Sequence, residues 1–416
     1  MMNNKRHLAL LLILALLLGL TACGSTNAGS DDEVDPVTIT LDIYPLDENG
    51  NRTAIDALLY DFRQAYPYVT INVNLLTGDT ASSDLSIAIE SGDCPDLLLG
   101  SLSQLQHAQR RGGMAVDLSD IWNSGTYTAV KSACTDATGL LYALPAVMDV
   151  TCMAINYEMF QASGALEYVD MENHSWTTEG FINAVKALKA ADFAPDVLAL
   201  YCGGQNGDAA TRALVTNLYG GTFTDEAHKT YTLNSEENIN ALTTLQGLSG
   251  VIFDKNIVAE DENILFQKQQ LAMSLYWNAE CQQPENFTAI PMAYPSESGR
   301  AEMPGEVWGF SCFDNGDESR LEISKALLSY LTDPAGVYSD LAAFCGHYPV
   351  YPASDEADDF AAFMPLMGRY DLYTPGFAVA RTEWYELLQR LGGGADVALE
   401  VETFCTNANA AAKAVD

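Results

Sequence analysis

The sequence is short of positive charge. It contains 20 lysine and arginine residues against 56 aspartate and glutamate residues, which gives a formal net charge of −36 at pH 7. A chain this acidic repels nucleic acid and anionic lipid headgroups, so the composition excludes a nucleic-acid-binding protein and attachment to a membrane through charge. We therefore expect no nucleic-acid partner.

Short catalytic and metal-binding motifs are also missing. The sequence has no HExxH, GxSxG, SxxK, P-loop or GxGxxG motif, and its five histidines show no metal-ligand spacing. Residues 47–51 resemble the start of a calcium loop, but Arg52 stands where such a loop requires glycine. We expect no enzymatic activity, cofactor or metal. A glycosidase-type carboxylate pair stays open, because only its separation in space would identify it.

Cysteine pairs of the CxxC type are absent. Eight of the nine cysteines follow Cys23 and are widely scattered. An exported chain with an even number of cysteines can form disulfides. Several of these residues lie in apolar stretches, as Cys152 does, where cysteine packs as a small hydrophobic side chain. We expect mostly free thiols.

Only one long apolar run occurs, at residues 8–20, after Lys5 and Arg6. It is too short to span a bilayer and predicts a secretory signal. The run ends in Leu-Thr-Ala before Cys23, which resembles the lipobox of bacterial lipoproteins. This resemblance implies a lipoprotein signal peptide over 1–22 and a lipidated Cys23 that carries diacylglycerol and palmitate. The mature chain would then lie on the extracytoplasmic face of the cell membrane, held by lipid alone. The alternative is an ordinary signal peptide with an incidental cysteine.

The chain that follows has the pattern of an α/β protein. Residues 23–36 are rich in small and acidic residues and predict a flexible linker. Val37–Ile43 and Val69–Leu75 alternate as strands, with a helix between them that ends at Pro67 and a short buried strand at 96–99. Strands separated by helices predict a parallel sheet.

A second segment of the same kind comes later. Cys152–Asn156 reads as a strand, and Thr177 is the expected N-cap of a helix whose apolar face contains Phe181, Val185 and Leu188. Further patterns predict a helix at 235–249, strands at 271–275 and 288–292, and mainly helix from 318 onward. The length allows two or three domains.

Several motifs occur in an order that is typical of one family. Residues 87–96 read IAIESGDCPD, residues 139–145 read GLLYALP, and residues 266–273 read FQKQQLAM before Trp277. With these motifs, the chain from Thr53 to about Ala410 resembles the extracellular solute-binding proteins of ABC importers, family 1, the sugar-binding type. Gln269 departs from the glycine that the family usually has.

The resemblance implies an α/β, two-lobe, periplasmic-binding-protein-like fold of the class II type, with the ligand cleft between lobes joined by hinge strands. It implies lobe crossings near 148–152, 291 and 345. The N-terminal lobe would comprise 37–148 plus 292–346, and the C-terminal lobe 149–291 plus 347–416. Such lobes close around a ligand by hinge motion.

The resemblance also indicates ligand-binding residues. Asp149 lies at the first expected crossing, where the family has an acid that hydrogen-bonds sugar hydroxyls. Trp277 resembles the family's stacking tryptophan, and Trp308 and Tyr348 lie near a crossing. Core packing is the alternative for each ring.

Three other candidates follow the first strands. Tyr44 ends the first strand at the edge where parallel sheets bind ligands, and Glu48 follows in the same loop, with core packing and a solvated loop acid as their alternatives. Ser101 and Ser103 occupy a loop that carries an aromatic or acidic residue in relatives, so here the first lobe either leaves room for the ligand or binds it through the hydroxyls.

The sequence therefore predicts a lipid-anchored, monomeric binding protein that delivers a sugar or oligosaccharide to an ABC importer permease. The same fold could instead bind a polyamine, a peptide or a metal ion. An exported glycoside hydrolase and a surface adhesin are the remaining alternatives.

Overall fold

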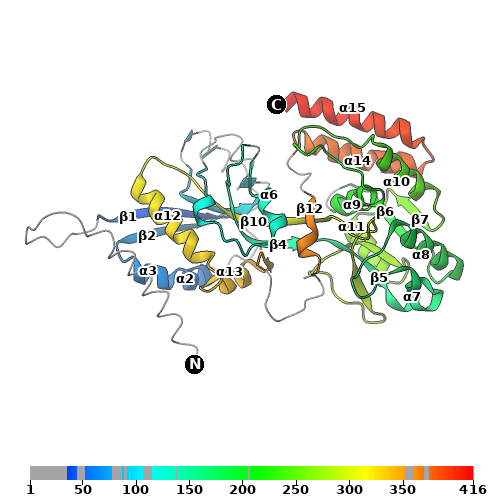
Figure 1. The fold of residues 1–416 in the computed structure, drawn as a ribbon, viewed down its shortest axis with the longest axis horizontal. Coiled ribbons are helices and arrows are strands. Elements are labelled where there is room, and N and C mark those ends of the chain that lie inside the picture. Colours follow the sequence, from blue (N-terminus) through cyan, green and yellow to red (C-terminus); the bar gives the residue numbers. More distant parts are fainter. Residues whose placement is uncertain are drawn as a thin grey trace, which may run out of the picture.

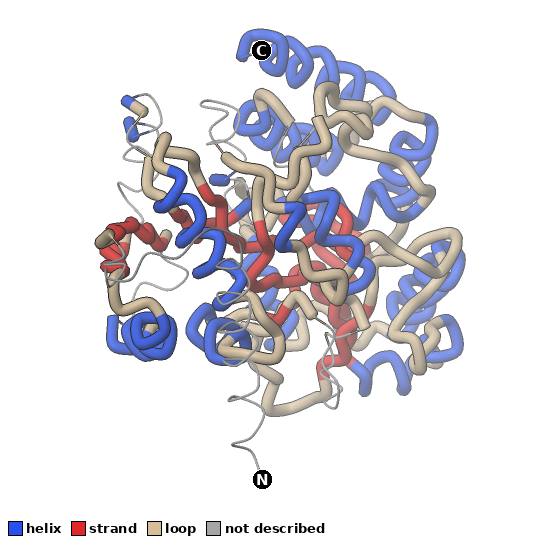
Figure 2. Tube along the Cα trace, turned by 60° about the vertical axis from the view of Figure 1, so that its left-hand side comes forward, coloured by secondary structure: helices blue, strands red, loops and turns tan. Residues whose placement is uncertain are grey.

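The computed structural model describes most of the chain from residue 35. The described residues are 35–44, 52–76, 87–88, 91–92, 94–102, 104–105, 115–136, 138–204, 207–351, 360, 362–369 and 374–415. The predictions for the signal peptide, Cys23, the linker up to residue 34, Glu48 and Ser103 lie outside these residues. Figure 1 shows two lobes side by side, and Figure 2 shows that the strands run through the interior with helices around them.

The first lobe is built on one mixed sheet with the strand order β11-β4-β10-β3-β1-β2, and β12 pairs with β10 beside this path. The predicted parallel core is confirmed, since β1 runs parallel to β2 and β3. β10 is antiparallel to both β3 and β4. The strands are β1 Val37–Ile43, β2 Val69–Leu75, β3 Leu97–Ser101, β4 Leu144–Val150, β10 Met303–Cys312, β11 Tyr348–Pro349 and β12 Met367–Arg369.

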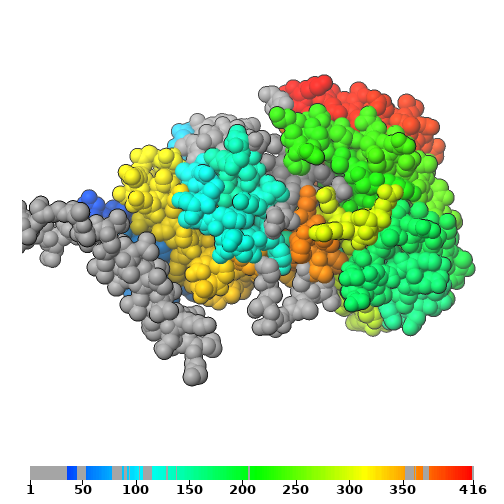
Figure 3. All heavy atoms as spheres, in the orientation of Figure 1, coloured from blue at the N-terminus to red at the C-terminus, as the bar shows by residue number. Residues whose placement is uncertain are grey.

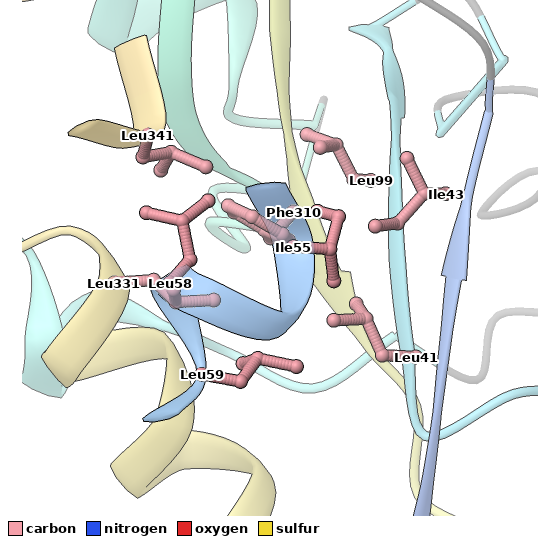
Figure 4. Close-up of a pocket in the computed structure, with 9 residues that line it drawn as sticks. All are labelled: Leu41, Ile43, Ile55, Leu58, Leu59, Leu99, Phe310, Leu331 and Leu341. Carbon is pink, nitrogen blue, oxygen red and sulfur yellow. The ribbon is translucent and has the colours of Figure 1, made fainter. Parts of the chain in front are cut away.

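Helices pack against this sheet to form the core of the first lobe (Figure 4). The predicted helix before Pro67 is present as α2 and α3, which are separated at Leu59. In the core, Leu41, Ile43, Leu99 and Phe310 of the sheet face apolar residues of α2, α12 and α13, around a residual cavity of about 10 Å³. That space is about one water molecule, so the core is closely filled. The helices are α2 Arg52–Leu58, α3 Tyr60–Ala65, α6 Thr128–Ala133, α12 Glu318–Leu331 and α13 Tyr338–Cys345.

The second lobe has its own sheet, in which β5 lies between β8 and β9 and is antiparallel to both. β6 and β7 form a parallel pair, and a parallel bridge between Asp196 and Leu271 leads from this pair toward β8. The strands are β5 Cys152–Asn156, β6 Leu198–Tyr201, β7 Val251–Asp254, β8 Met273–Trp277 and β9 Ala289–Met292.

Seven helices of the described chain surround these strands. α15, the red helix along the upper edge of the lobe in Figure 3, packs on α14. The predicted N-cap is confirmed: the Thr177 side chain accepts a hydrogen bond from the Gly180 amide, and the apolar face of α8 is buried. The helices are α7 Tyr157–Ser163, α8 Thr178–Ala191, α9 Asp208–Leu218, α10 Glu236–Gly247, α11 Ala259–Gln267, α14 Phe377–Gly392 and α15 Val397–Val415. Within the described part of the chain, no helix combines the length and the apolar content needed to cross a membrane.

The lobes are connected by strands that run from one sheet toward the other. Only Thr151 separates the end of β4 from the start of β5, and its amide donates to the Pro304 carbonyl at 2.9 Å. The third expected crossing needs a correction. β11 pairs with β4, so Tyr348 and Pro349 belong to the first sheet and not to the second lobe. Val350 is held there too, because its amide bonds to the Tyr338 hydroxyl of α13.

Candidate ligand-binding site

A cavity of about 220 Å³ lies where segments of both lobes meet. Asp149 comes from β4, immediately before the chain enters the second lobe. Ala279 and Glu280 follow β8 in the second lobe, and Gly346, His347 and Tyr348 connect α13 to β11. The volume is below the usual range of about 300–1,000 Å³ for a drug-sized ligand, so this cavity has room for part of an oligosaccharide.

Strand pairing gathers polar side chains at one end of the first sheet. In the antiparallel ladder, Glu306 of β10 lies opposite Asp149 of β4, and Trp308 lies opposite Ser101 of β3. Directly opposed residues of antiparallel strands have Cβ atoms about 4.5–5.5 Å apart. Two carboxyl groups are therefore close neighbours at the edge where β4 leaves the sheet.

Burial and mutual repulsion shift the titration of these acids. Burial, with smaller contributions from Glu280 and Glu306, raises the pKa of Asp149 to about 7, while a hydrogen bond from the Val150 backbone opposes the shift. Burial also raises the pKa of Glu306, while a hydrogen bond with Ser101 opposes the shift. Near neutral pH, Asp149 therefore exists both as the carboxylate, which accepts a hydrogen bond from a hydroxyl group, and as the carboxylic acid, which can donate one.

An aromatic stack borders the same cavity. The Trp308 indole and the His347 imidazole lie with ring centroids 4.1 Å apart and an interplanar angle of 11°. Nδ1 of His347 is 3.8 Å from Oδ2 of Asp149. Tyr348 follows directly, and its ring lies 6.0 Å from that of Phe360. Aromatic faces beside carboxyl groups suit the C–H faces and hydroxyls of a carbohydrate.

The other predicted residues lie in different surroundings. Tyr44 is half-buried at the end of β1, where its amide donates to the Leu99 carbonyl at 2.8 Å. Ser101 is 5% exposed, and its amide donates to the Gln104 side chain. Both residues lie at the end of the first sheet that carries Asp149, but neither lines the described cavity. Their role in binding stays a prediction.

The buried position of Trp277 contradicts its predicted role in stacking on the ligand. Its side chain is 1% exposed, and its ring packs edge-on against Phe266 at 5.8 Å. A ring enclosed in the core of the second lobe offers no face to a ligand. The tryptophan at the end of β8 is therefore a packing residue in this structure.

Sequence reasoning missed three residues at the site, namely Glu280, Glu306 and His347. Signals for two of them were present. Glu306 stands two positions before Trp308, so a strand through both places them on one face. His347 directly precedes Tyr348, which was a candidate.

No metal centre accompanies these acids: the described residues contain no group of three histidine, cysteine, aspartate or glutamate side chains that could hold a metal ion. The eight cysteines after Cys23 are free thiols, and seven of them are buried. The part of the site that the structure describes therefore offers hydrogen-bonding and stacking groups.

Two α/β lobes joined by strands, with a polar and aromatic cavity at the junction, define the class of two-lobe binding proteins that close around a ligand. Comparison with protein families assigns the particular group. The model for the bacterial extracellular solute-binding protein family matches residues 48–338, and the chain belongs to that family. The family is one of binding proteins rather than enzymes. A search of curated protein sequences finds no match.

Solved structures share the fold at low sequence identity. The cyclic alpha-maltosyl-1,6-maltose binding protein from Arthrobacter globiformis is 19% identical and has a TM-score of 0.70, and the match covers 91% of this chain and 100% of that one. The sugar-binding protein MalE from Xanthomonas citri is 13% identical with a TM-score of 0.71, and the match covers 91% and 98%. The GacH receptor of Streptomyces glaucescens is 16% identical with a TM-score of 0.60, and the match covers 91% and 98%.

Proposed function

We propose that this protein captures a sugar or oligosaccharide outside the cell and delivers it to the permease of an ABC importer. It performs no bond chemistry. The mature chain is a monomer, lipidated at Cys23 after removal of residues 1–22, and it contacts the membrane through lipid alone. The expected lobe boundaries, with β11 and β12 moved to the first lobe, are part of this proposal.

The cavity at the lobe junction is the observation that carries the proposal. It brings a carboxyl group of mixed protonation, a second acid, a phenol and an imidazole together between two lobes. A hydrogen bond to a charged group contributes roughly 1.5–3 kcal/mol, and a few such bonds with stacking reach a micromolar affinity of about −8 kcal/mol. Three of the similar structures are those of a cyclic alpha-maltosyl-1,6-maltose binding protein, the GacH receptor in complex with acarbose, and MalE3 of T. maritima with maltose bound, which supports an oligosaccharide here.

A thermal-shift screen against uncharged oligosaccharides, followed by calorimetry, tests the proposal. Saturating ligand at 100 times its dissociation constant adds about 2.7 kcal/mol to the free energy of unfolding, which appears as a raised midpoint. The recovered sugar should be intact after hours with the protein. Release of shorter products would instead identify a glycoside hydrolase, and a panel with no binder would reject the function.

The Asp149→Ala variant tests the site itself. We expect it to weaken binding more than tenfold, because a ligand hydroxyl loses a buried partner. Asp120→Ala is the matched control, since that carboxylate pairs with Lys325 on the outer surface of the first lobe. Equal affinities of the two variants would remove Asp149 from the site.

A polyamine is the second candidate, and the charge of the cavity favours it. The described lining contains Asp149 and Glu280 with no lysine or arginine. Calorimetry separates the candidates: affinity for a polyamine falls steeply as salt is added, whereas affinity for a neutral sugar hardly changes.

A further inference from the structure

His347 is the ring that borders the cavity, while Trp308 lies behind it. Both rings belong to one parallel stack, but only His347 is among the residues that line the cavity. One face of the imidazole is covered by the indole. The stack leaves the second face and the edge of the imidazole as the parts available to a ligand, and 12% of the side chain is exposed.

The backbone holds His347 in this place. Gly346 ends α13 in the left-handed conformation with φ 72°, and its amide bonds to the Ala342 carbonyl. Tyr348, one residue later, pairs with Met148 of β4. The imidazole is thus fixed between a helix end and a strand of the first sheet, one strand away from Asp149.

The surroundings keep the imidazole neutral but close to acids. Burial lowers the pKa of His347, and Glu280 opposes that shift. The groups that face it are Asp149 of β4, Glu280 after β8, Trp308 of β10 and Tyr348 beside it, and Glu306 of β10 lies opposite Asp149. A neutral imidazole has an apolar face for stacking and one nitrogen of each kind for hydrogen bonds.

We propose that His347 is a specificity-determining ligand contact: a bound sugar ring stacks on its free face, with Trp308 as a rigid support, while its Nδ1 edge positions the Asp149 carboxyl for the sugar hydroxyls. This proposal rests on the proposed function and names the subsite where one ring of the sugar binds. Trp308 then acts through His347 and does not touch the sugar.

Acidification gives this arrangement a distinct signature. A protonated imidazole attracts Asp149 and Glu280 and is more strongly hydrated, so it stacks less well on a neutral sugar. Affinity should therefore decrease as the pH is lowered from 7.5 to 5.5. Asp149 also titrates in this range, so the part of the decrease that disappears when His347 is replaced measures the contribution of the imidazole. A purely structural role for His347 would leave the pH profile of binding unchanged.

Calorimetry on the full mature chain tests the proposal with maltose, maltotriose, raffinose and cellobiose as probes at pH 7.5 and 5.5. The variants are His347→Ala, His347→Phe and the control His228→Ala. His228 is a partly buried histidine of the second lobe whose Nδ1 contacts Thr224, and it does not line the cavity. His347→Phe keeps an aromatic face, so it tests stacking even if His347→Ala folds poorly.

We expect His347→Ala to weaken the best probe at least tenfold at pH 7.5, and His347→Phe to retain most of the affinity with a flatter pH profile. His228→Ala should match the original protein. If the original protein binds a probe and both His347 variants bind it equally well with the same pH profile, the inference is wrong and the proposed function stands. If the original protein binds none of the probes, both are rejected.

Discussion

Asp96 shows how one residue of a recognised motif can serve the fold instead of the ligand. Its side chain is 2% exposed and accepts hydrogen bonds from the Thr40 amide, the Asn315 side chain and the Arg320 guanidinium. These partners lie on β1, before α12 and on α12. The aspartate that ends the motif at residues 87–96 thus ties β1 of the first sheet to α12, which packs against it.

Replacing Asp96 with alanine should destabilise the protein by about 1–3 kcal/mol, because the Thr40 amide, the Asn315 side chain and the partly exposed Arg320 guanidinium lose their common acceptor. Asp56→Ala is the matched control. Its ion pair with Arg63 is half exposed, and such pairs contribute about 0–1 kcal/mol. Urea unfolding of the ligand-free variants measures both effects. A loss of less than 1 kcal/mol for Asp96→Ala would contradict the structural role.

The candidate site was only partly predictable from the sequence. Which side chains are buried, and which lie close together, depends on segments that are distant in sequence. Asp149 was found because it lies at a lobe crossing, and the structure places it in the cavity. Trp277 looked similar in the sequence, but packing against Phe266 encloses it. His347 contacts Trp308 across 39 positions, and no local pattern indicates such a pair.

At the scale of elements, local patterns predicted more. β1 and β2 begin and end at the predicted residues, because strict alternation fixes a strand with one buried face. The lobe boundary near 346 was wrong, since the pairing of β11 with β4 is a long-range contact.

Gly305 of β10 lies where neighbouring strands approach closely. A Cβ at this position would lie 2.3 Å from the Asp149 carbonyl and 2.3 Å from the Met367 sulfur.

Gly305→Ala should therefore destabilise the protein by about 1–3 kcal/mol, because β10 has to move away from β4 or β12. Gly247→Ala is the control, since nothing lies within 4 Å of a Cβ there. This residue ends α10, and alanine in a helix is favoured over glycine by roughly 0.5–1 kcal/mol. Thermal unfolding compares the two. A Gly305→Ala protein as stable as the original would show that the strands can separate at little cost.

At the scale of the whole molecule, the short connection between β4 and β5 allows the lobes to rotate as units. Thr151 is the only residue between these strands. Each lobe has its own sheet, so a rotation at the connection leaves the strand pairing within each lobe intact. The acids that line the cavity belong to different lobes, with Asp149 on β4 and Glu280 after β8.

Small-angle scattering should show a smaller radius of gyration when a saturating oligosaccharide is added, because the sugar contacts both lobes and favours the closed form. The Asp149→Ala variant at the same sugar concentration is the control and should stay closer to the ligand-free value. A sugar that binds tightly without changing the scattering curve would contradict closure.

Stability should also depend on pH through a buried acid in the second lobe. Glu262 of α11 is fully buried, and its carboxylate accepts hydrogen bonds from the Ser274 hydroxyl and the Leu275 amide, both at 2.7 Å. Burial raises the pKa of Glu262 to about 8, against these lowering hydrogen bonds. The folded protein therefore holds this proton more tightly than the unfolded chain does.

Because the pKa of Glu262 is raised in the folded state, its contribution to the free energy of unfolding is fully present below the pKa of the unfolded chain, near 4.5. That contribution is lost as the pH rises through about 8. Repulsion among the 56 acids acts in the same direction as they ionise.

Glu262→Gln isolates the buried group, because glutamine keeps an acceptor for Leu275 and can donate to Ser274. We expect urea unfolding of this variant to lose less stability between pH 5 and 8 than the original protein, by on the order of 2 kcal/mol. Glu260→Gln, an exposed change on the same helix, removes one charge without burial and should follow the original curve. Parallel curves for all three proteins would show that Glu262 is ionised in the folded state throughout this range.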